Sequence, residues 1–223
     1  MRKVFQIFKQ SKLQANRDKC HFACSKIKYL EHFITPDDIE VDPEKTSVIQ
    51  DMPEPKNVKQ VQSFLQTCSW YRRFIPNFSD FSKPLSNLTK KASLWRWEHE
   101  EQKAFNILKQ LLVSPPVLKQ CDSAKPYIIR TDASNFALGA VLAQGEIPDE
   151  LPIEYASRLL TSAEKNYSTT KREALSVVWA LQKFIGYIEG AEIIIASDHH
   201  PPRWLMILKS PPGRLACLAL QFQ

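Results

Sequence analysis

The chain has 223 residues, of which 43% are hydrophobic, and it carries a formal net charge of +6. This length allows one or two domains with a real hydrophobic core, and the composition excludes a wholly disordered chain. Residues 1–100 hold 17 Lys and Arg against 12 Asp and Glu, compared with 13 against 12 in residues 101–223. A basic first half suits a polyanionic partner such as nucleic acid, although an ordinary solvated surface gives the same mild excess.

The cysteines are odd in number, scattered and without a CxxC pair: Cys20, Cys24, Cys68, Cys121 and Cys217. This usage argues for a reducing compartment and against a disulfide framework. Cys20, His21 and Cys24 lack the second pair of ligands that a tetrahedral zinc site needs. With no visible signal peptide and no apolar run of about 18 residues, we expect an intracellular protein, cytoplasmic or nuclear, that is not secreted and has no membrane partner.

The first part of the chain is predicted to be mainly helical. In chain order, we expect a helix over 3–13, strands at 19–24 and 27–34, turns at 35–42, and helices from 43, over 58–75, near 79–90 and over 98–113. Two of these helices have local start signals. Asp42 precedes Pro43, a pair typical of an N-cap and first helical position, and Asn57 with Gln60 resembles a capping box.

The pattern changes after Pro115 and Pro116, which mark a predicted boundary between two parts. The second part is predicted to contain strands at 126–132, 137–144 and 152–157, a helix at 168–187, a strand at 192–197 and a last helix after residue 202. Three strands followed by alternating helix, strand and helix indicate an α/β fold.

Three carboxylates in the second part lie at the ends or edges of these elements. Asp132 ends the first predicted strand, Asp198 ends the strand at 192–197, and Glu173 lies at the edge of the apolar stripe of the helix between them. A helical crossover favours parallel pairing of the two strands, which would bring their carboxyl ends together. Clustered carboxylates suit Mg²⁺, and two such ions can drive phosphodiester hydrolysis.

Each carboxylate also has an ordinary structural interpretation. Asp132 could cap a turn with Ser134, and Asp198 could be the N-cap of the last helix. Glu173 could be a surface residue that pairs with Lys171 or Arg172. The spacing of the three carboxylates alone is therefore compatible with a metal-dependent hydrolase, but also with these ordinary structural roles.

Longer motifs in the second part carry a family resemblance: TDAS at 131–134, GAVLAQ at 139–144, YASR at 155–158, NYSTTKREALSVVWALQKF at 166–184 and SDHHPPRWL at 197–205. They resemble the RNase H-like domain of retroelement Pol polyproteins, with gypsy-type LTR retrotransposons as the closest likeness. The first part resembles the region upstream in those polyproteins: KCHFACSKIKYLEHFIT at 19–35 is similar to the closing hairpin of a reverse transcriptase palm, and the stretch 42–79 is similar to the thumb.

This resemblance implies a mixed five-stranded RNase H-like sheet with flanking helices, preceded by an α+β region that is mainly helical. Residues 1–40 would be a palm remnant, 41–118 the thumb and connection, and 119–223 an RNase H-like domain expected to be truncated at its C-terminus, before the family's fourth carboxylate. The family's polymerase motif, an aromatic residue followed by any residue and two aspartates, is absent. We therefore expect no polymerase activity from this chain alone.

The implied activity is metal-dependent hydrolysis of the RNA strand of RNA–DNA hybrids. Asp132, Glu173 and Asp198 match the family's catalytic metal ligands, which implies two Mg²⁺ ions, with Mn²⁺ as a substitute. The implied partners are an RNA–DNA hybrid or other nucleic acid, and the missing fingers, palm and downstream Pol segments. Two alternatives stay open: an inactive, degenerate remnant that binds nucleic acid, or a domesticated interaction module.

Basic and aromatic residues on or beside the thumb-like helices suit a phosphate backbone and exposed bases: Lys56, Lys59, Tyr71, Arg72 and Arg73. In the alternative interpretation, Trp70 and the phenylalanines that follow it are core and the arginines are merely solvated. Glu31, Gln66 and Ser69 stand where relatives commonly have glycine. At position 31, in the predicted hairpin, this replacement is expected to strain the turn.

Overall fold

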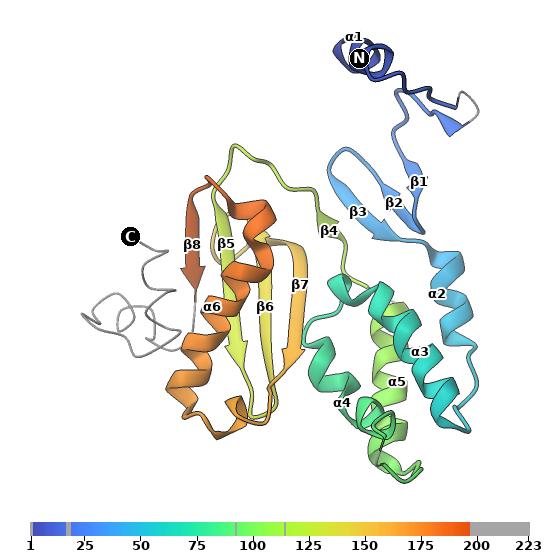
Figure 1. Cartoon of the computed structure of the whole chain (residues 1–223), viewed down its shortest axis with the longest axis vertical. Coiled ribbons are helices and arrows are strands. Elements are labelled where there is room, and N and C mark those ends of the chain that lie inside the picture. The colour runs from blue at the N-terminus through green and yellow to red at the C-terminus, as the bar shows by residue number, and fades with distance from the viewer. Residues whose placement is uncertain (1, 17–18, 92, 114, 197–223) are drawn as a thin grey trace.

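The computed structural model describes residues 2–16, 19–91, 93–113 and 115–196. The first part, on the right in Figure 1, comprises α1 (Arg2–Gln10), β1 (Ile27–Tyr29), β2 (His32–Ile34), β3 (Asp38–Val41), α2 (Pro43–Gln50), α3 (Val58–Trp70), α4 (Phe78–Leu88), α5 (His99–Val113) and β4 (Leu118–Lys119). The second part comprises β5 (Tyr127–Ala133), β6 (Ala137–Gln144), β7 (Leu151–Leu159), α6 (Thr169–Ile188) and β8 (Ile193–Ala196). Among the described residues, no helix combines the length and apolar character of a membrane span.

The four short strands of the first part form an antiparallel sheet in the order β1-β2-β3-β4. Two predictions are wrong here: residues 19–24 do not form a strand, and the expected turns at 35–42 contain β3. The predicted strand at 27–34 is instead a two-stranded hairpin. β4 pairs with β3 through Leu118 and Ile39, so this sheet is completed by a strand from the far end of the first part.

The hairpin turn between β1 and β2 has left-handed backbone at two non-glycine residues. Leu30 has φ of 46° and Glu31 has φ of 65°, in a region that side chains other than glycine occupy at a cost. The strain expected at position 31 is thus present, and it extends to its neighbour. Glu31 also contacts the rest of the first part, because its carboxylate accepts a hydrogen bond from the Tyr71 hydroxyl at 3.3 Å and pairs with Lys45 at 3.1 Å.

The two predicted helix caps are confirmed. Asp42 accepts a hydrogen bond from the Glu44 backbone N–H at 3.1 Å, and Pro43 opens α2. Asn57 accepts from the Gln60 N–H at 3.0 Å at the start of α3. These bonds satisfy backbone donors that a helix start leaves without partners.

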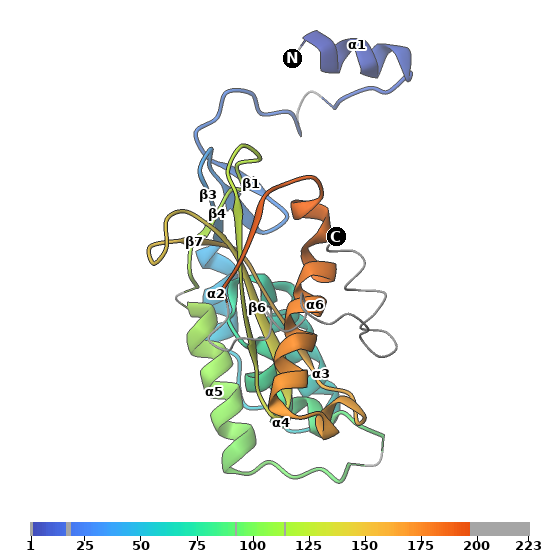
Figure 2. The same ribbon diagram turned by 90° about the vertical axis from the view of Figure 1, so that its left-hand side faces the viewer.

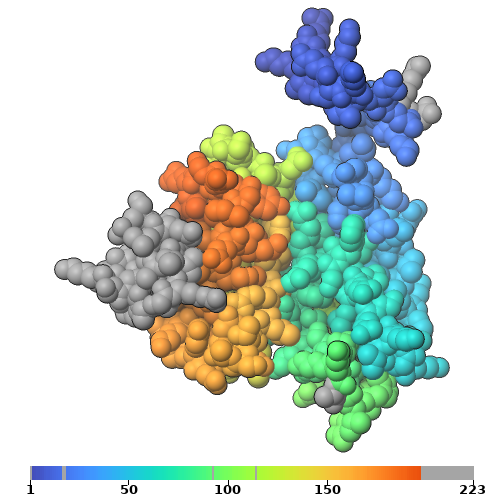
Figure 3. Space-filling view, viewed as in Figure 1, coloured from blue at the N-terminus to red at the C-terminus, as the bar shows by residue number. Residues whose placement is uncertain are grey.

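Helices α3, α4 and α5 surround the core of the first part, which is apolar and almost fully buried. Its most buried side chains are Val61, Cys68, Phe74, Leu85, Leu108, Leu112 and Leu118. The predicted helix over 58–75 ends earlier, at Trp70, and a 3₁₀ turn follows at Arg72–Phe74. By contrast, α1 has no buried residue and projects away from the remainder of the first part (Figure 3).

The second part has a mixed sheet in the order β7-β6-β5-β8. β5 pairs antiparallel with β6 and parallel with β8, where Ile129 lies opposite Ile195. The parallel pairing predicted from the helical crossover is therefore confirmed. Four strands lie within the described residues, and the predicted last helix, after residue 202, lies outside them.

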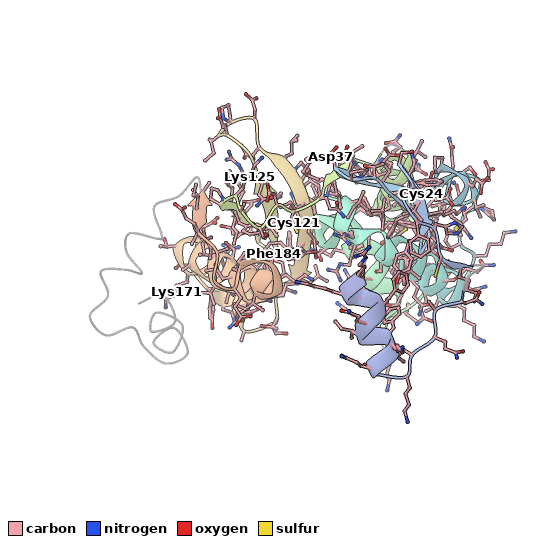
Figure 4. The ribbon with its side chains drawn as sticks, turned by 90° about the horizontal axis from the view of Figure 1, so that it is seen from above. Cys24, Asp37, Cys121, Lys125, Lys171 and Phe184 are labelled. Carbon is pink, nitrogen blue, oxygen red and sulfur yellow. The ribbon has the colours of Figure 1, made fainter. Side chains whose placement is uncertain are left out.

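One face of this sheet packs against α6, which runs along one side of it in Figure 2. Tyr127 and Ile129 of β5 meet Val177, Leu181 and Phe184 of α6 in the second core, and the view from above in Figure 4 labels Phe184 on that helix. The first part contacts the sheet elsewhere, mainly at β7. The Ser79 N–H donates to the Ser157 hydroxyl at 2.9 Å, so α4 and β7 are joined by direct hydrogen bonding.

Candidate active site

Asp132 lies near the end of β5 with an exposed side chain. Tyr127 and Ile129 of the same strand face α6. Because successive side chains of a strand point to opposite faces, Asp132 points away from α6. Its partner across the ladder is Gly139 of β6. The carboxylate is therefore presented to solvent at the carboxyl end of a buried strand.

A pocket of about 210 Å³ opens beside Asp132. Residues lining it include Asn77, Arg130, Asp132, Gly139, Tyr155 and Ala196. A Cβ atom on Gly139 would collide with Oδ1 of Asn77, so the glycine allows the Asn77 side chain to lie directly on the strand. The start of α4 thereby forms one wall of the pocket that contains Asp132.

Glu173 lies near the start of α6 and is only 4% exposed. The Ser168 hydroxyl caps this helix by accepting from the Lys171 N–H at 3.4 Å. One turn later, the Ser176 hydroxyl donates to the Glu173 carbonyl at 2.6 Å. The sequence predicted that Glu173 lies at the rim of the buried seam and away from open water, and the low exposure of its side chain agrees with this prediction.

Arg172 ties the start of α6 to the turn that follows β5. Its Nη1 donates to the Ser134 carbonyl at 3.0 Å and to Oδ1 of Asn135 at 2.6 Å. The residue before Glu173 is thus bonded to the turn that begins two residues after Asp132. The start of α6, which carries Glu173, therefore lies beside the turn that follows β5.

The donor types fit a hard divalent cation, because Mg²⁺ prefers carboxylate oxygens and retains water, and the pocket at Asp132 is open to solvent. β8 runs parallel to β5, with Ala196 opposite Arg130. Asp198 lies outside the described residues. Within the part of the chain that the structure describes, no group of three or more His, Cys, Asp or Glu is placed to hold an ion. The gathering of all three carboxylates therefore stays a prediction.

A further carboxylate, that of Asp80 in the first turn of α4, lies close to Asp132. The Ser134 hydroxyl donates to Oδ1 of Asp80 at 3.1 Å. Burial raises the pKa of Asp80, the hydrogen bond from Ser134 opposes this, and the negative charge of Asp132 raises it further. The first part of the chain thus places the carboxyl group of Asp80 near the end of β5.

The predicted nucleic-acid contacts are only partly accessible. Lys56 and Lys59 are exposed. Tyr71 is 2% exposed, and burial together with the Glu31 carboxylate raises the pKa of its hydroxyl to about 12. Its assignment to a binding surface is therefore wrong, because a ring enclosed in the core has no free face for a base. Trp70, by contrast, is 53% exposed.

The two arginines beside Tyr71 have structural contacts. Arg72 is exposed, but its Nη2 donates to the Ser157 carbonyl of β7 at 2.5 Å. Arg73 is half-buried, and its guanidinium lies 6.0 Å from the centre of the Phe74 ring. Arg72 therefore joins the two parts of the chain.

Comparison with known proteins supports the interpretation of the fold. Residues 97–195 match the RNase H-like domain found in reverse transcriptase. The Pol polyprotein of Drosophila melanogaster transposon 297 is 39% identical over 213 residues, covering 95% of this chain and 20% of the relative. The Schizosaccharomyces pombe transposon Tf2-3 polyprotein is 35% identical over 199 residues, covering 88% of this chain and 15% of the relative. This chain is a retrotransposon Pol segment with an RNase H-like domain.

Solved structures show the same fold for nearly the whole Pol segment. The foamy viral protease-reverse transcriptase in complex with an RNA/DNA hybrid superposes with a TM-score of 0.78 at 23% identity, covering 99% of this chain and 31% of that one. A second foamy viral structure, in complex with double-stranded DNA, has a TM-score of 0.76 at 23% identity, covering 99% and 40%. The Pol segment spans about a fifth of the length of the transposon relatives that it matches.

Asp80 is the residue that sequence reasoning missed in this Pol segment. An acidic residue in the first turn of a helix is usually explained by the helix dipole alone. Its partner Ser134 is 54 positions away in the chain, and no local pattern links the two. The available signal was the Ser134 hydroxyl within the TDAS motif, which needs a partner when it is partly buried.

Proposed function

We propose that this Pol segment hydrolyses the RNA strand of RNA–DNA hybrids, with Asp132, Glu173 and Asp198 as ligands of two Mg²⁺ ions, for which Mn²⁺ can substitute. The parallel pairing of β5 with β8 supports the proposal, because it brings the carboxyl end of β5, which carries Asp132, and the carboxyl end of β8 to the same edge of the sheet. The bonds from Arg172 support it by bringing the start of α6 to the same edge. The foamy viral relative in complex with an RNA/DNA hybrid supports the choice of substrate.

The chemistry divides between the ions and the chain. When bound, two such ions activate water and stabilise the leaving oxygen of the phosphodiester. The exposed Asp132 carboxylate can meet a ligand that arrives from solvent. Glu173 is buried and held by the packing of α6, so its position is fixed before any ligand binds.

A nucleic-acid surface is proposed on α3. Its exposed residues Lys59, Gln62, Gln66 and Trp70 follow each other at spacings of three and four, which places them on one face of the helix. A cation, two amides and a half-exposed indole suit a phosphate backbone and unstacked bases. We also expect the fingers, palm and downstream segments of a longer polyprotein as covalent partners, because the transposon relatives extend well beyond this chain.

The decisive experiment compares the full chain with Asp132→Asn in cleavage of a labelled RNA–DNA hybrid with Mg²⁺. The matched control is Asp149→Asn, an exposed aspartate in the loop between β6 and β7. Replacing a metal ligand is expected to cost at least about 100-fold in rate, more than the loss of an outer partner. The control should retain full activity.

Mn²⁺ binding measured by titration, without substrate, gives a second readout for the same variants. Asp132→Asn should weaken Mn²⁺ binding, and Asp149→Asn should not. Equal cleavage by the wild type and Asp132→Asn would refute the role of Asp132. A wild-type chain that binds the hybrid in a shift assay but never cuts it would instead identify a nucleic-acid-binding remnant.

A further inference from the structure

The turn after Asp132 is held from two sides by elements of different parts of the chain. From α6, Arg172 binds the Ser134 carbonyl and the Asn135 side chain. From α4, Asp80 binds the Ser134 hydroxyl, and the ammonium of Lys83 lies over the Phe136 ring. At this turn, as at Asn77, the first part of the chain therefore reaches the candidate active site.

The Ser134 side chain organises the turn from inside. Its Oγ accepts hydrogen bonds from the N–H groups of Phe136 at 3.1 Å and Ala137 at 2.9 Å. Its single proton has two acceptors within reach, Oδ1 of Asp80 at 3.1 Å and the Ala137 carbonyl at 3.2 Å. An ionised carboxylate is the stronger acceptor. With the proton directed to Asp80, the oxygen lone pairs face the two N–H donors.

Asp80 is itself placed by rigid contacts. Asn77, which precedes α4, lies on Gly139 beside Asp132. The Ser79 N–H and hydroxyl both meet the Ser157 hydroxyl, at 2.9 and 3.1 Å. Asp80 follows directly in the same helical turn, where the helix dipole favours a negative charge. The carboxylate thus has a fixed position relative to the sheet.

We propose that Asp80 is a positioning residue for the nuclease, which acts through the Ser134 hydroxyl to fix the turn after β5 and with it the orientation of Asp132. This proposal rests on the proposed function. It assigns to the first part of the chain a role in the geometry of the candidate active site. Asp80 acts here as a hydrogen-bond acceptor and does not serve as a ligand of the ion.

The test uses Asp80→Asn, Asp80→Ala and Ser134→Ala in the full chain. Asparagine retains an acceptor oxygen for the Ser134 hydroxyl but loses the charge, whereas alanine loses both. Asp149→Ala is the matched control, since it removes an exposed carboxylate in the loop between β6 and β7 and leaves Ser134 untouched. Three quantities are measured for each variant: backbone hydrogen exchange at Phe136 and Ala137, Mn²⁺ affinity without substrate, and kcat and KM on an RNA–DNA hybrid.

We expect Asp80→Ala to accelerate exchange at the two amides by about 3–10-fold. It should weaken Mn²⁺ binding and lower kcat by about tenfold each, with KM unchanged. Ser134→Ala should lower Mn²⁺ affinity and kcat similarly, and the double variant should lose no more than either single one. Asp80→Asn should lose less than Asp80→Ala, because its neutral amide oxygen is a weaker but still present acceptor, and Asp149→Ala should stay within about threefold of the wild type.

Two results would overturn the proposal. Unchanged exchange in Asp80→Ala would mean that the carboxylate does not hold the turn. Equal losses in Asp80→Asn and Asp80→Ala would mean that the charge, and not the acceptor, is what the site uses. Because the exchange measurement needs neither metal nor substrate, it decides the positioning role even if the wild-type chain proves unable to cleave a hybrid.

Discussion

Arg158 and Glu164 form a two-bond ion pair at the end of β7, with Nη1 to Oε2 at 2.7 Å and Nη2 to Oε1 at 3.0 Å. The same carboxylate accepts from the Thr161 N–H at 2.8 Å, and the Thr161 hydroxyl accepts from the Glu164 N–H at 3.3 Å. This reciprocal arrangement resembles a capping box. It fixes the segment between the last described antiparallel strand and α6.

The ion pair between Arg158 and Glu164 makes the stability of the folded chain depend on pH in the acid range. Hydrogen bonds from Arg158 lower the pKa of Glu164 from 4.5 to about 2, although burial opposes the shift. A lowered folded pKa contributes stability that is complete above 4.5 and is lost as pH falls towards 2. Glu164→Gln should therefore lower Tm near neutral pH, and the difference from the wild type should shrink below pH 4.5, as followed by circular dichroism.

The matched control for this pH dependence is Glu146→Gln, at an exposed glutamate in the loop after β6. Its Tm difference from the wild type should be small at both ends of the pH range. A Glu164→Gln difference that stays constant from neutral to acid pH would contradict the linkage.

The strained hairpin turn predicts a stabilising substitution. Leu30 is 60% exposed and has φ of 46°, and asparagine tolerates this backbone region better than leucine. Leu30→Asn should raise stability by about 1 kcal/mol, or roughly 2–4 °C in Tm for a chain of this size. Leu94→Asn, at a 76% exposed loop leucine without positive φ, should show no gain. Equal Tm changes in the two variants would show that the turn is not strained.

Trp70 is predicted to contact bases. Removing a stacking aromatic residue costs about 1–3 kcal/mol of nucleic-acid binding, so Trp70→Ala should raise the Kd for an RNA–DNA hybrid by about fivefold or more. Because the side chain is 53% exposed, Tm should change little. Tyr29→Ala, at a 59% exposed aromatic residue of β1, serves as the control in the same fluorescence anisotropy assay. A Tyr29→Ala effect equal to that of Trp70→Ala would argue against a specific surface on α3.

Lys59 is predicted to contact a phosphate group. Releasing one counterion per neutralised phosphate gives a salt slope of about 0.9 per contact on duplex DNA. Lys59→Gln should therefore flatten the plot of log affinity against log salt concentration by about that amount. Lys103→Gln, at an exposed lysine of α5, should leave the slope unchanged. An unaltered slope in Lys59→Gln would remove this residue from the proposed surface.

Thiol reactivity tests the core of the first part. Burial raises the pKa of Cys68 to about 12, whereas Cys24 and Cys121 are exposed; Figure 4 labels both of these cysteines. Since the thiolate is the reactive form, iodoacetamide should label Cys24 and Cys121 in the native chain and reach Cys68 only after denaturation. Peptide mass spectrometry measures the order, and native labelling of Cys68 at the rate of Cys121 would contradict the packing of α3.

Local chemistry explains which parts of the fold the sequence predicted well. The caps at Asp42 and Asn57 act within three residues, so their signals are visible in a short stretch of chain. The parallel pairing of β5 and β8 followed from the helix between them. β4 was missed because two residues carry no readable alternation, and it forms only where β3 offers an edge.

The candidate site was predictable only as far as local patterns reach. Asp132 and Glu173 became candidates from their positions at a strand end and a helix edge, and the structure confirms those positions but not their roles. Tyr71 was misassigned because a cluster of aromatic and basic residues suggests a surface, whereas the end of α3 at Trp70 turns this ring into the core. Asp80 was missed because its link to Ser134 exists only after the two parts of the chain have packed together.

The late arrival of β4 has a consequence for how this protein is made. During synthesis the hairpin and β3 emerge before the helices α2 to α5, and all of these emerge before Leu118 does. Until then β3 exposes an open edge that other strands can join. A nascent chain halted before this point would carry the β3 edge as a template for aggregation, and that edge closes only when Leu118 and Lys119 pair with it.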